Sequence, residues 1–328
     1  MEKITKGILI GTGIAAASAM AMMGTTQLTS DYFVRLALDR KGVPSFEKRM
    51  GKLSGSPLTP QVLEHLRHKA RKLSLCCTDA QIKTKDGLTL MGHWRDREDA
   101  KRVIIAMHGW RSNWARDFGM IADFWHEEGS CVLYPEQRGQ GNSEGAYIGF
   151  GLLERHDCRL WIDWVNRRTG GKLPIYLAGI SMGASTVLMT AGMELPDNVH
   201  GVIADCGFTS PDAIWAHVAH HNLHLNYGFY AASANDLCKK RLTIGSKDYS
   251  TLDAMADCEV PVLFIHGTDD RFVPVEMTYE NYKACVAPKH LLVVPGANHG
   301  MSYWVNRAGY EGAVRDFWAK YDKKPRQV

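Results

Sequence analysis

From Asp79 onward the sequence alternates short apolar runs with longer stretches of helical periodicity, and this alternation constrains the fold more than any other feature. The first two runs, 80–84 and 88–93, flank Lys85-Asp86-Gly87, a sequence typical of a β-hairpin turn. Six further strands are predicted at 103–107, 131–134, 174–178, 199–204, 262–265 and 290–294. Helical stretches at 115–128, 152–168 and 184–194 separate several of them. The pattern predicts an α/β fold with an eight-stranded, mostly parallel sheet and helices on both faces.

One segment, at about 209–257, interrupts the alternation with an aromatic and histidine-rich composition and no clear strand. We expect a small helical lid there, over the carboxyl edge of the sheet where ligands bind in open α/β sheets. Its histidines are spaced for one helix face, and their role stays open; they are His217, His220, His221 and His224. No carboxylate or thiol completes a metal-ligand set nearby, so we expect no metal site.

The N-terminus carries a candidate targeting segment. Lys3 and Lys6 precede an uncharged run over residues 7–24, which as a helix would measure roughly 27 Å, close to the thickness of a bilayer core. We predict that residues 1–28 form a membrane anchor, with the catalytic domain outside the cytoplasm. A cleaved signal, which would give a secreted protein, and an interfacial helix are the alternatives.

The remaining chain divides into two predicted parts. Residues 29–78 read as a helical extension, broken near residues 42–44 and 51–60 by glycine and proline. Residues 79–328 form the α/β domain that carries the lid. We expect the extension to pack against this domain, and a role as a lid is the less favoured alternative.

Charge and cysteine content exclude several classes of function. The 39 basic and 35 acidic residues give a net charge of +4, too balanced for a nucleic-acid-binding surface. None of the eight cysteines forms a Cys-x-x-Cys pair, so neither a zinc site nor a thioredoxin-type redox motif is indicated.

The most informative motif is Gly179-Ile180-Ser181-Met182-Gly183, directly after one predicted strand and before a helix. Glycines at both ends allow a sharp strand-to-helix turn that exposes the serine hydroxyl. The amide groups at the start of the following helix favour negative charge at that point. Ser181 is therefore the candidate nucleophile.

A serine hydroxyl needs a base to accept its proton, and the base needs an acid to orient it. His299 lies after the last predicted strand, in Pro295-Gly296-Ala297-Asn298-His299-Gly300, among small residues that leave room for the ring. Two aspartates, Asp269 and Asp270, follow the preceding strand and compete for the role of the acid.

Two backbone amides are candidates for stabilising an oxyanion. Gly109 follows the strand 103–107 and allows close approach to a substrate, so the amide of Trp110 is one donor. The amide of Met182, next to the nucleophile, is the other. We expect His108 to have a structural role, because it lies at the end of an early strand.

Together these residues resemble the α/β-hydrolase superfamily over roughly Asp79 to Tyr321. They are similar in particular to bacterial, often membrane-anchored hydrolases related to prolyl-oligopeptidase-type and cinnamoyl-esterase-type enzymes. The order serine, aspartate, histidine is that of the superfamily, and its His-Gly-x-x-Asp-x-x-Val-Pro pattern implies that Asp270 is the acid. In the family's Asp-x-Arg-Gly-x-Gly-x-Ser loop, Glu136 replaces the usual aspartate, which puts the local hydrogen bonds of that loop in doubt.

We therefore expect a serine hydrolase, most specifically a carboxylic-ester hydrolase that works through an acyl-enzyme without a cofactor or metal. The expected partner is a small-molecule ester or acyl substrate. A prolyl-oligopeptidase-like serine peptidase and a non-catalytic surface binding module are the alternatives. The acyl group, the alcohol and the oligomeric state stay open, because this fold serves many substrates.

Overall fold

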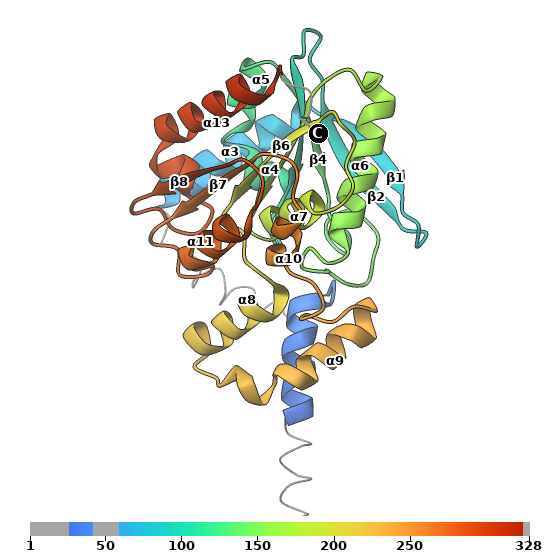
Figure 1. Cartoon of the computed structure of the whole chain (residues 1–328), viewed down its shortest axis with the longest axis vertical. Helices are drawn as coiled ribbons and strands as arrows, with labels where there is room; N and C mark the ends of the chain where they lie inside the picture. Colours follow the sequence, from blue (N-terminus) through green and yellow to red (C-terminus); the bar gives the residue numbers. More distant parts are fainter. Residues whose placement is uncertain (1–25, 42–58, 324–328) are drawn as a thin grey trace, which may run out of the picture.

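The computed structural model describes residues 26–41 and 59–323, and an eight-stranded sheet forms its centre (Figure 1). The strands are β1 (Thr78–Lys83), β2 (Thr89–Arg95), β3 (Arg102–Met107), β4 (Ser130–Pro135), β5 (Ile175–Ile180), β6 (Val199–Asp205), β7 (Val262–Gly267) and β8 (Lys289–Val294). Their order across the sheet is β1-β2-β4-β3-β5-β6-β7-β8. β2 pairs antiparallel with β1 and β4, and the pairs from β4 to β8 are parallel. The predicted mostly parallel eight-stranded sheet is confirmed.

Helices cover both faces of the sheet because its central strands are apolar on both sides. Every residue of β3 is buried, and successive residues such as Ile104 and Ile105 belong to different hydrophobic clusters. One face is covered by α6 (Glu154–Thr169), α7 (Met182–Ala191), α10 (Thr251–Ala256) and α11 (Val275–Ala284). The other is covered by α3 (Pro60–Leu75), α4 (Trp114–Phe118), α5 (Ala122–Glu127), α12 (Ser302–Val305) and α13 (Arg307–Tyr321).

The helix predicted over 115–128 is in fact two short helices, α4 and α5, with Gly119 between them. At this point α3 lies so close that a Cβ atom added to Gly119 would be 2.8 Å from the backbone nitrogen of Ala70. The chain turns here to accommodate this close packing against a segment about fifty positions earlier. Local periodicity in the sequence carries no information about such a distant contact.

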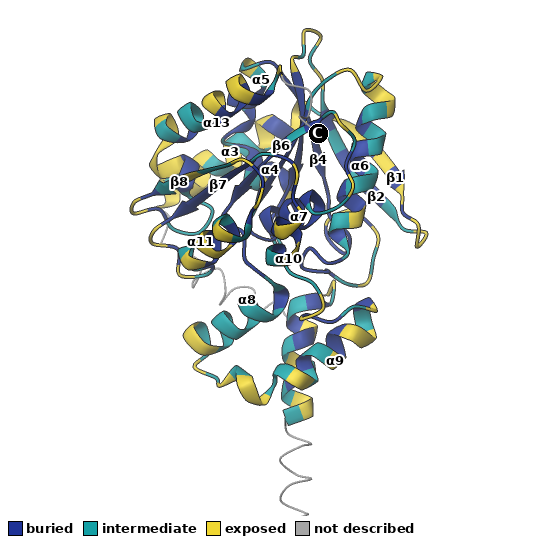
Figure 2. Cartoon of the chain, viewed as in Figure 1, coloured by how far each residue is buried: buried dark blue, intermediate teal, exposed yellow. Residues whose placement is uncertain are grey.

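The lid lies below the carboxyl edge of the sheet in Figure 1 and consists of α8 (Pro211–His217), η1 (Val218–Asn222), η2 (Tyr227–Phe229) and α9 (Ala231–Leu242). A further helix, residues 26–38, lies beside α9 and is drawn in blue. The lid is less buried than the sheet (Figure 2). A third hydrophobic cluster joins the two parts, with Val34 and Leu38 from helix 26–38 packed with Ile214 and Leu237 from the lid.

The histidines of the lid do not share one helix face as predicted. α8 ends at His217, the following η1 is a π-turn that contains His220 and His221, and His224 has a φ of 56° in a turn. The ring of His221 lies 4.5 Å from that of His217 and 4.7 Å from that of His220 between centroids, so three of the four histidines form one contact cluster.

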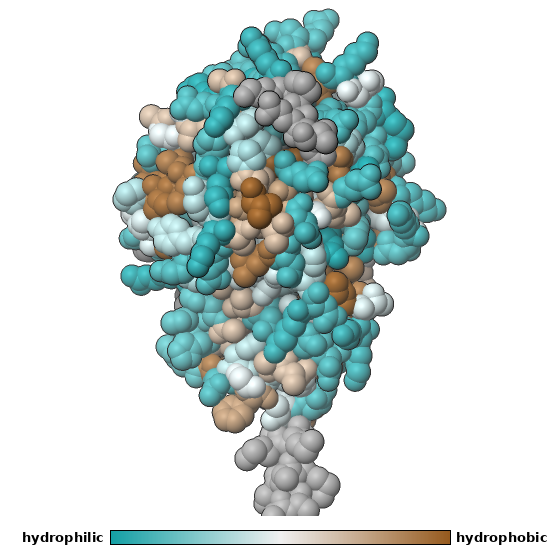
Figure 3. Space-filling view, viewed as in Figure 1, coloured by the Kyte–Doolittle hydropathy of each residue, from teal (hydrophilic) through white to brown (hydrophobic). Residues whose placement is uncertain are grey.

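The two described helices of the predicted extension lie in different places. Helix 26–38 lies against the lid, whereas α3 packs on α4 at the sheet. Across residues 26–41 and 59–323 no helix combines the length and apolar character needed to cross a bilayer. The run 7–24, on which the anchor or signal prediction depends, falls outside the described residues, so that prediction stands as made. On the face seen in Figure 3, apolar side chains form small separate patches among hydrophilic ones.

Candidate active site

Ser181 occupies the turn between β5 and α7 with φ 57° and ψ −121°, a conformation that side chains rarely adopt. Its amide donates to the carbonyl of Asp205 at 2.9 Å, which fixes the turn to the end of β6. The two flanking glycines are required by packing. A Cβ atom on Gly183 would collide with the carbonyl oxygen of Met107, and one on Gly179 would collide with the carbonyl of Gly183.

The structure brings Ser181, His299 and Asp270 together from three loops at the carboxyl edge of the sheet. His299 Nε2 lies 2.9 Å from Ser181 Oγ, and His299 Nδ1 lies 2.7 Å from Asp270 Oδ2. The ring is thus placed to accept the serine proton at Nε2 while Nδ1–H donates to the carboxylate. Asp269, the competing aspartate, is exposed and bonds to the hydroxyl of Thr268 instead.

The carboxylate of Asp270 is held from both sides. Its Oδ1 accepts from the amides of Phe272 and Val273, each at 2.9 Å. Its Oδ2 faces His266 Nε2 at 3.2 Å in addition to His299. Burial acts to raise the pKa of Asp270, but the charge of His299 and the hydrogen bonds from both histidines hold that pKa well below its usual range. Asp270 is therefore ionised at neutral pH.

The pKa of His299 moves in the opposite direction. Burial acts to lower it, but the charge of Asp270 and the hydrogen bond to that carboxylate raise the pKa well above its usual value. The Cys206 thiol also lies against this pair, and Cys206, Asp270 and His299 are the one cluster of metal-ligand residue types within the described chain. Asp270 and the His299 imidazole are hydrogen-bonded to one another, so the candidate triad accounts for the closeness of these three residues.

The two backbone amides predicted to bind an oxyanion belong to separate elements near Ser181. Met182 is the first residue of α7, so no earlier helical turn can accept from its amide. The amide of Trp110 bonds to no other described residue. A Cβ atom added to Gly109 would be 3.5 Å from the Cβ of Ser181, which shows how closely this turn approaches the nucleophile. The amides of Trp110 and Met182 remain the predicted oxyanion donors beside Ser181.

Asp117, in α4, was missed in the sequence but fixes the turn that carries Trp110. Its Oδ2 accepts from the amide of Gly109 at 2.8 Å, and Oδ1 accepts from the Ser112 hydroxyl. His108 is buried, with Nδ1 2.8 Å from the Gly109 carbonyl, and its Nε2 accepts from the amide of Gln137 at 3.2 Å. Burial lowers the pKa of His108, so this ring is neutral. The position agrees with the structural role expected for it.

Glu136, which replaces the aspartate of the family pattern, still makes hydrogen bonds within its loop. Its carboxylate accepts from the backbone amide of Asn142 and lies 2.9 Å from His93 Nε2. The hydroxyl of Ser143 donates to the Glu136 carbonyl, which closes the loop on itself. A glutamate therefore supports the loop here in place of the aspartate of the family pattern.

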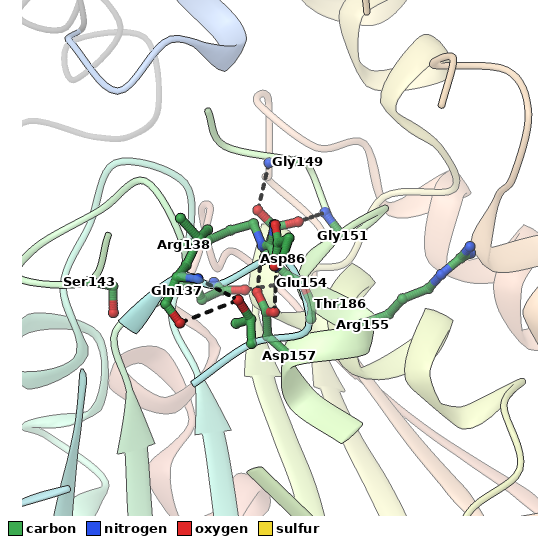
Figure 4. A network of polar contacts seen from close by, with 12 residues as sticks. Asp86, Gln137, Arg138, Ser143, Gly149, Gly151, Glu154, Arg155, Asp157 and Thr186 are labelled. Atoms are coloured by element: carbon green, nitrogen blue, oxygen red, sulfur yellow. Dashed lines mark hydrogen bonds and ion pairs between the residues drawn. The ribbon is translucent and has the colours of Figure 1, made fainter. Parts of the chain in front are cut away.

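A buried ionic network lies beneath the loop that follows (Figure 4). Arg138 donates to both oxygens of Asp157, each at 2.6 Å, and also to Asp86. The neighbouring Glu154 is fully buried, which raises its pKa, and it accepts from the amides of Gly149 and Gly151 at 2.6 Å and 2.9 Å.

The residue between those glycines, Phe150, projects into the site. Its φ of 52° is unusual for a phenylalanine, and the two amide bonds to Glu154 hold it in that conformation. The Phe150 ring lies 6.0 Å from Trp110, 5.9 Å from Phe208 and 5.5 Å from Trp215 between centroids. The ionic network thus positions the centre of an aromatic cluster.

An apolar pocket of about 100 Å³ opens beside Ser181. Helix 26–38 supplies one wall, the lid another, and the aromatic cluster a third; representative lining residues are Phe33, Val34, Ile214, Trp215, Phe150 and Phe272. Among the described residues that line it, none is Asp, Glu, Lys, Arg or His. The contribution of helix 26–38 was not predicted, although its apolar positions Phe33, Leu36 and Leu38 were the available signal.

Known proteins resemble this chain in sequence. A family model described as serine aminopeptidase, S33, matches residues 98–225. The protein YqkD of Bacillus subtilis, described as uncharacterized, is 30% identical over 231 residues, which cover 70% of this chain and 75% of YqkD. The chain belongs to the α/β-hydrolase superfamily. The protein YfhR of Escherichia coli K12, also described as uncharacterized, is 25% identical over 226 residues, 67% of this chain and 72% of YfhR.

Solved structures of α/β-hydrolases share the fold. An esterase of Pyrococcus furiosus aligns with a TM-score of 0.62 and 22% identity, over 76% of this chain and 93% of that one. Est1E of Butyrivibrio proteoclasticus, solved with ferulic acid bound, aligns with a TM-score of 0.55 and 20% identity, over 75% of this chain and all of that one. These likenesses show that the chain has the α/β-hydrolase fold.

Proposed function

We propose that this α/β-hydrolase is a carboxylic-ester hydrolase that works through an acyl-enzyme on Ser181. The observation that carries the proposal is the hydrogen-bonded chain from Ser181 Oγ through His299 to Asp270, which lies beside an apolar pocket. A serine so placed has a base for its proton and a site next to it for an apolar substrate.

The first half of the reaction forms the acyl-enzyme. His299 Nε2 accepts the proton of Ser181 Oγ as the oxygen attacks the ester carbonyl carbon. The amides of Trp110 and Met182 stabilise the resulting oxyanion, and Asp270 stabilises the imidazolium. The tetrahedral intermediate collapses, the bond to the alcohol oxygen breaks, and His299 returns the proton to that oxygen.

The second half releases the acid. Water attacks the acyl carbonyl while His299 Nε2 accepts its proton, and the same two amides stabilise the second oxyanion. When this intermediate collapses, Ser181 Oγ leaves and regains the proton from His299. No step needs a metal or a cofactor.

A peptidase is the second candidate, favoured by the name of the matching family. An aminopeptidase recognises a substrate ammonium group, which a carboxylate would bind. The described lining of the pocket contains no acidic side chain, which favours an ester over a peptide with a free amino terminus. A non-catalytic binding module is disfavoured because it has no need for the Ser181–His299–Asp270 arrangement.

The test is labelling of the full-length chain by a fluorophosphonate probe, with mass mapping of the adduct, alongside hydrolysis of p-nitrophenyl esters and a peptide anilide. We expect an adduct on Ser181, ester turnover, and the loss of both in Ser181→Ala, with unchanged thermal unfolding. Turnover of the anilide alone would favour the peptidase. Ester turnover that survives in Ser181→Ala would contradict the mechanism.

A further inference from the structure

The pocket beside Ser181 indicates the chemical class of the substrate, an inference that rests on the proposed function. We propose that the pocket holds the acyl group and that this acyl group is uncharged and apolar. Trp110, whose amide is a candidate oxyanion donor, lines the pocket with Ser181, whereas His299 is absent from its described lining. Since His299 faces the departing alcohol, the pocket lies on the acyl side of the carbonyl.

The volume of the pocket limits the size of the acyl group. An apolar cavity of about 150 Å³ in another protein accommodates benzene. The pocket here, at about 100 Å³, belongs to the same size class. It therefore suits a short alkyl chain or a single ring, and a long fatty-acyl chain would extend beyond it.

The lining of the pocket decides against charged acyl groups. A carboxylate or ammonium group carried into it would lose its hydration and find no charged partner among the described lining residues. An alkyl group of the same size would gain from burial against Phe33, Val34 and Ile214. The selectivity is therefore expected in the acyl part of the substrate and not in the alcohol.

The experiment compares three p-nitrophenyl esters on the full-length chain: the pentanoate, the hemisuccinate of similar length, and its neutral methyl ester. We expect kcat/KM for the hemisuccinate to be lower than for the pentanoate by at least about 100-fold, with the methyl ester between them. Moving the charge to the alcohol, in 4-carboxyphenyl pentanoate, should have a much smaller effect.

Each outcome separates this inference from the proposed function. Comparable kcat/KM values for the pentanoate and the hemisuccinate, with Ser181 still labelled by fluorophosphonate, would overturn the acyl assignment and leave the esterase. Discrimination confined to the alcohol would show that the pocket holds the alcohol, which also overturns it. Absence of both labelling and ester turnover would instead overturn the proposed function.

A pair of variants tests whether helix 26–38 is a wall of this acyl site. Ala37 lines the pocket, so Ala37→Phe should lower the ratio of pentanoate to acetate turnover by at least about tenfold. Leu28→Phe adds similar bulk on the same helix at a position that is 74% exposed, and should leave the ratio unchanged. If Ala37→Phe does not fold, Ala219→Phe fills the pocket from the lid. An unchanged ratio in the folded pocket variant would contradict the inference.

A second inference rests on hydrogen bonds rather than on the pocket. We infer that Arg111 is a positioning residue for the candidate oxyanion donor Trp110. Arg111 follows Trp110 directly and has a φ of 49°, and its amide donates to Gln140 Oε1 at 2.6 Å. Its guanidinium lies 5.1 Å from the centre of the Trp110 ring.

Both side chains of this turn attach to the end of helix 26–38. Arg111 donates to the carbonyls of Leu36 at 3.0 Å and Asp39 at 2.5 Å, while Trp110 Nε1 donates to the carbonyl of Ala37 at 2.8 Å. A cation at the negative end of a helix dipole is favoured there. These bonds restrain the backbone of the turn, so we expect them to keep the Trp110 amide in one orientation.

The test uses Arg111→Gln, and Arg111→Gly, which tolerates the positive φ but lacks the guanidinium. Both should lower kcat per fluorophosphonate-titrated site by at least about tenfold with little change in KM, because the oxyanion is stabilised only after attack. Affinity for phenylboronic acid, which forms a tetrahedral adduct with the serine, should fall in parallel.

The matched control is Arg307→Gln, which removes an arginine that is 64% exposed in its pair with Glu311 on α13. It should leave kcat, KM and boronate affinity unchanged. A purely structural role for Arg111 would lower the fraction of titratable sites or the melting temperature, with normal kcat per site. That result, or an unchanged kcat, would overturn the inference.

Discussion

His266 lies directly behind Asp270, with its Nε2 atom 3.2 Å from the same carboxylate oxygen that faces His299. The His266 ring is fully buried, and its Nε2 is also 2.9 Å from the carbonyl of Val273. A carbonyl can only accept, so Nε2 carries a proton, and Nδ1 lies 2.6 Å from the Thr278 hydroxyl. The hydrogen-bonded chain therefore extends beyond the candidate triad to Thr278.

We expect His266→Phe to lower kcat by about tenfold or more, because Asp270 loses one of the donors that orient its carboxylate. The same variant should shift the acidic limb of the kcat/KM profile, which a loss of folded protein alone would not move. His68→Phe, at an exposed position on α3, is the control and should behave as the parent. If His266→Phe had the same kcat and the same acidic limb of the kcat/KM profile as the parent protein, this role would be contradicted.

The pH profile follows from the raised pKa of His299. The imidazole must be neutral to accept the serine proton, so kcat/KM should fall as the pH drops through that pKa. We expect the acidic limb at a pH above the usual histidine value of about 6.5. Because Asp270 raises the pKa, Asp270→Asn should move the limb of the residual activity to lower pH. An acidic limb well below 6.5 in the parent would contradict the assignment.

The two neighbouring aspartates should respond very differently to the loss of charge. Asp270→Asn should lower kcat by about 10⁴-fold, because the imidazolium loses its partner and the ring loses its tautomer. Asp269→Asn should leave kcat nearly unchanged, since this side chain is exposed and bonds only to Thr268 among the described residues. A larger loss of kcat in Asp269→Asn than in Asp270→Asn would show that Asp269 is the acid.

The turn that carries Ser181 should not tolerate a methyl group at Gly183. Gly183→Ala places a Cβ against the carbonyl oxygen of Met107, so we expect loss of activity together with a lower free energy of unfolding in urea. Gly312→Ala, in α13 with open space around the added Cβ, should keep full activity and gain up to about 1 kcal/mol. An active Gly183→Ala enzyme of normal stability would show that the turn is looser than described.

The buried ionic network should contribute more to stability than a partly exposed ion pair. Asp157→Asn removes the buried carboxylate that Arg138 bonds twice and leaves the guanidinium with Asp86 as its partner, which should cost about 3 kcal/mol of unfolding free energy. Asp163→Asn removes a partly exposed pair with Arg159 and should cost under about 1 kcal/mol. Equal costs in urea denaturation would mean that solvent reaches the network.

Much of the fold, and the residues that meet in the candidate triad, could be predicted because the relevant signals are local. The eight strands are short apolar runs between turns, and Ser181 is recognised from the glycines within two positions of it. His299 and Asp270 each follow a strand, and parallel strands bring their carboxyl ends to one edge.

The supporting residues could not be predicted because their partners are distant in the chain or carry no motif. Asp117 accepts from a backbone amide eight positions earlier in the chain. Any side chain with an acceptor in that place could make this bond, so no sequence motif marks it. Trp110 and Arg111 bond to carbonyls more than seventy positions away, and a carbonyl leaves no trace in the sequence. The π-turn after His217 likewise departs from the regular helical spacing that the prediction assumed.

The end of helix 26–38 is attached to the turn that carries Trp110 and Arg111 through main-chain carbonyls. A main-chain carbonyl is the same in every residue type, so these bonds do not depend on the side chains of the helix. Phe33 and Val34, which face the pocket, take no part in those bonds. Substitutions at these two positions can therefore reshape the wall without loosening its attachment. If the proposed function holds, single substitutions on this helix can change the acyl group that the pocket accepts while the candidate triad at the sheet stays as it is.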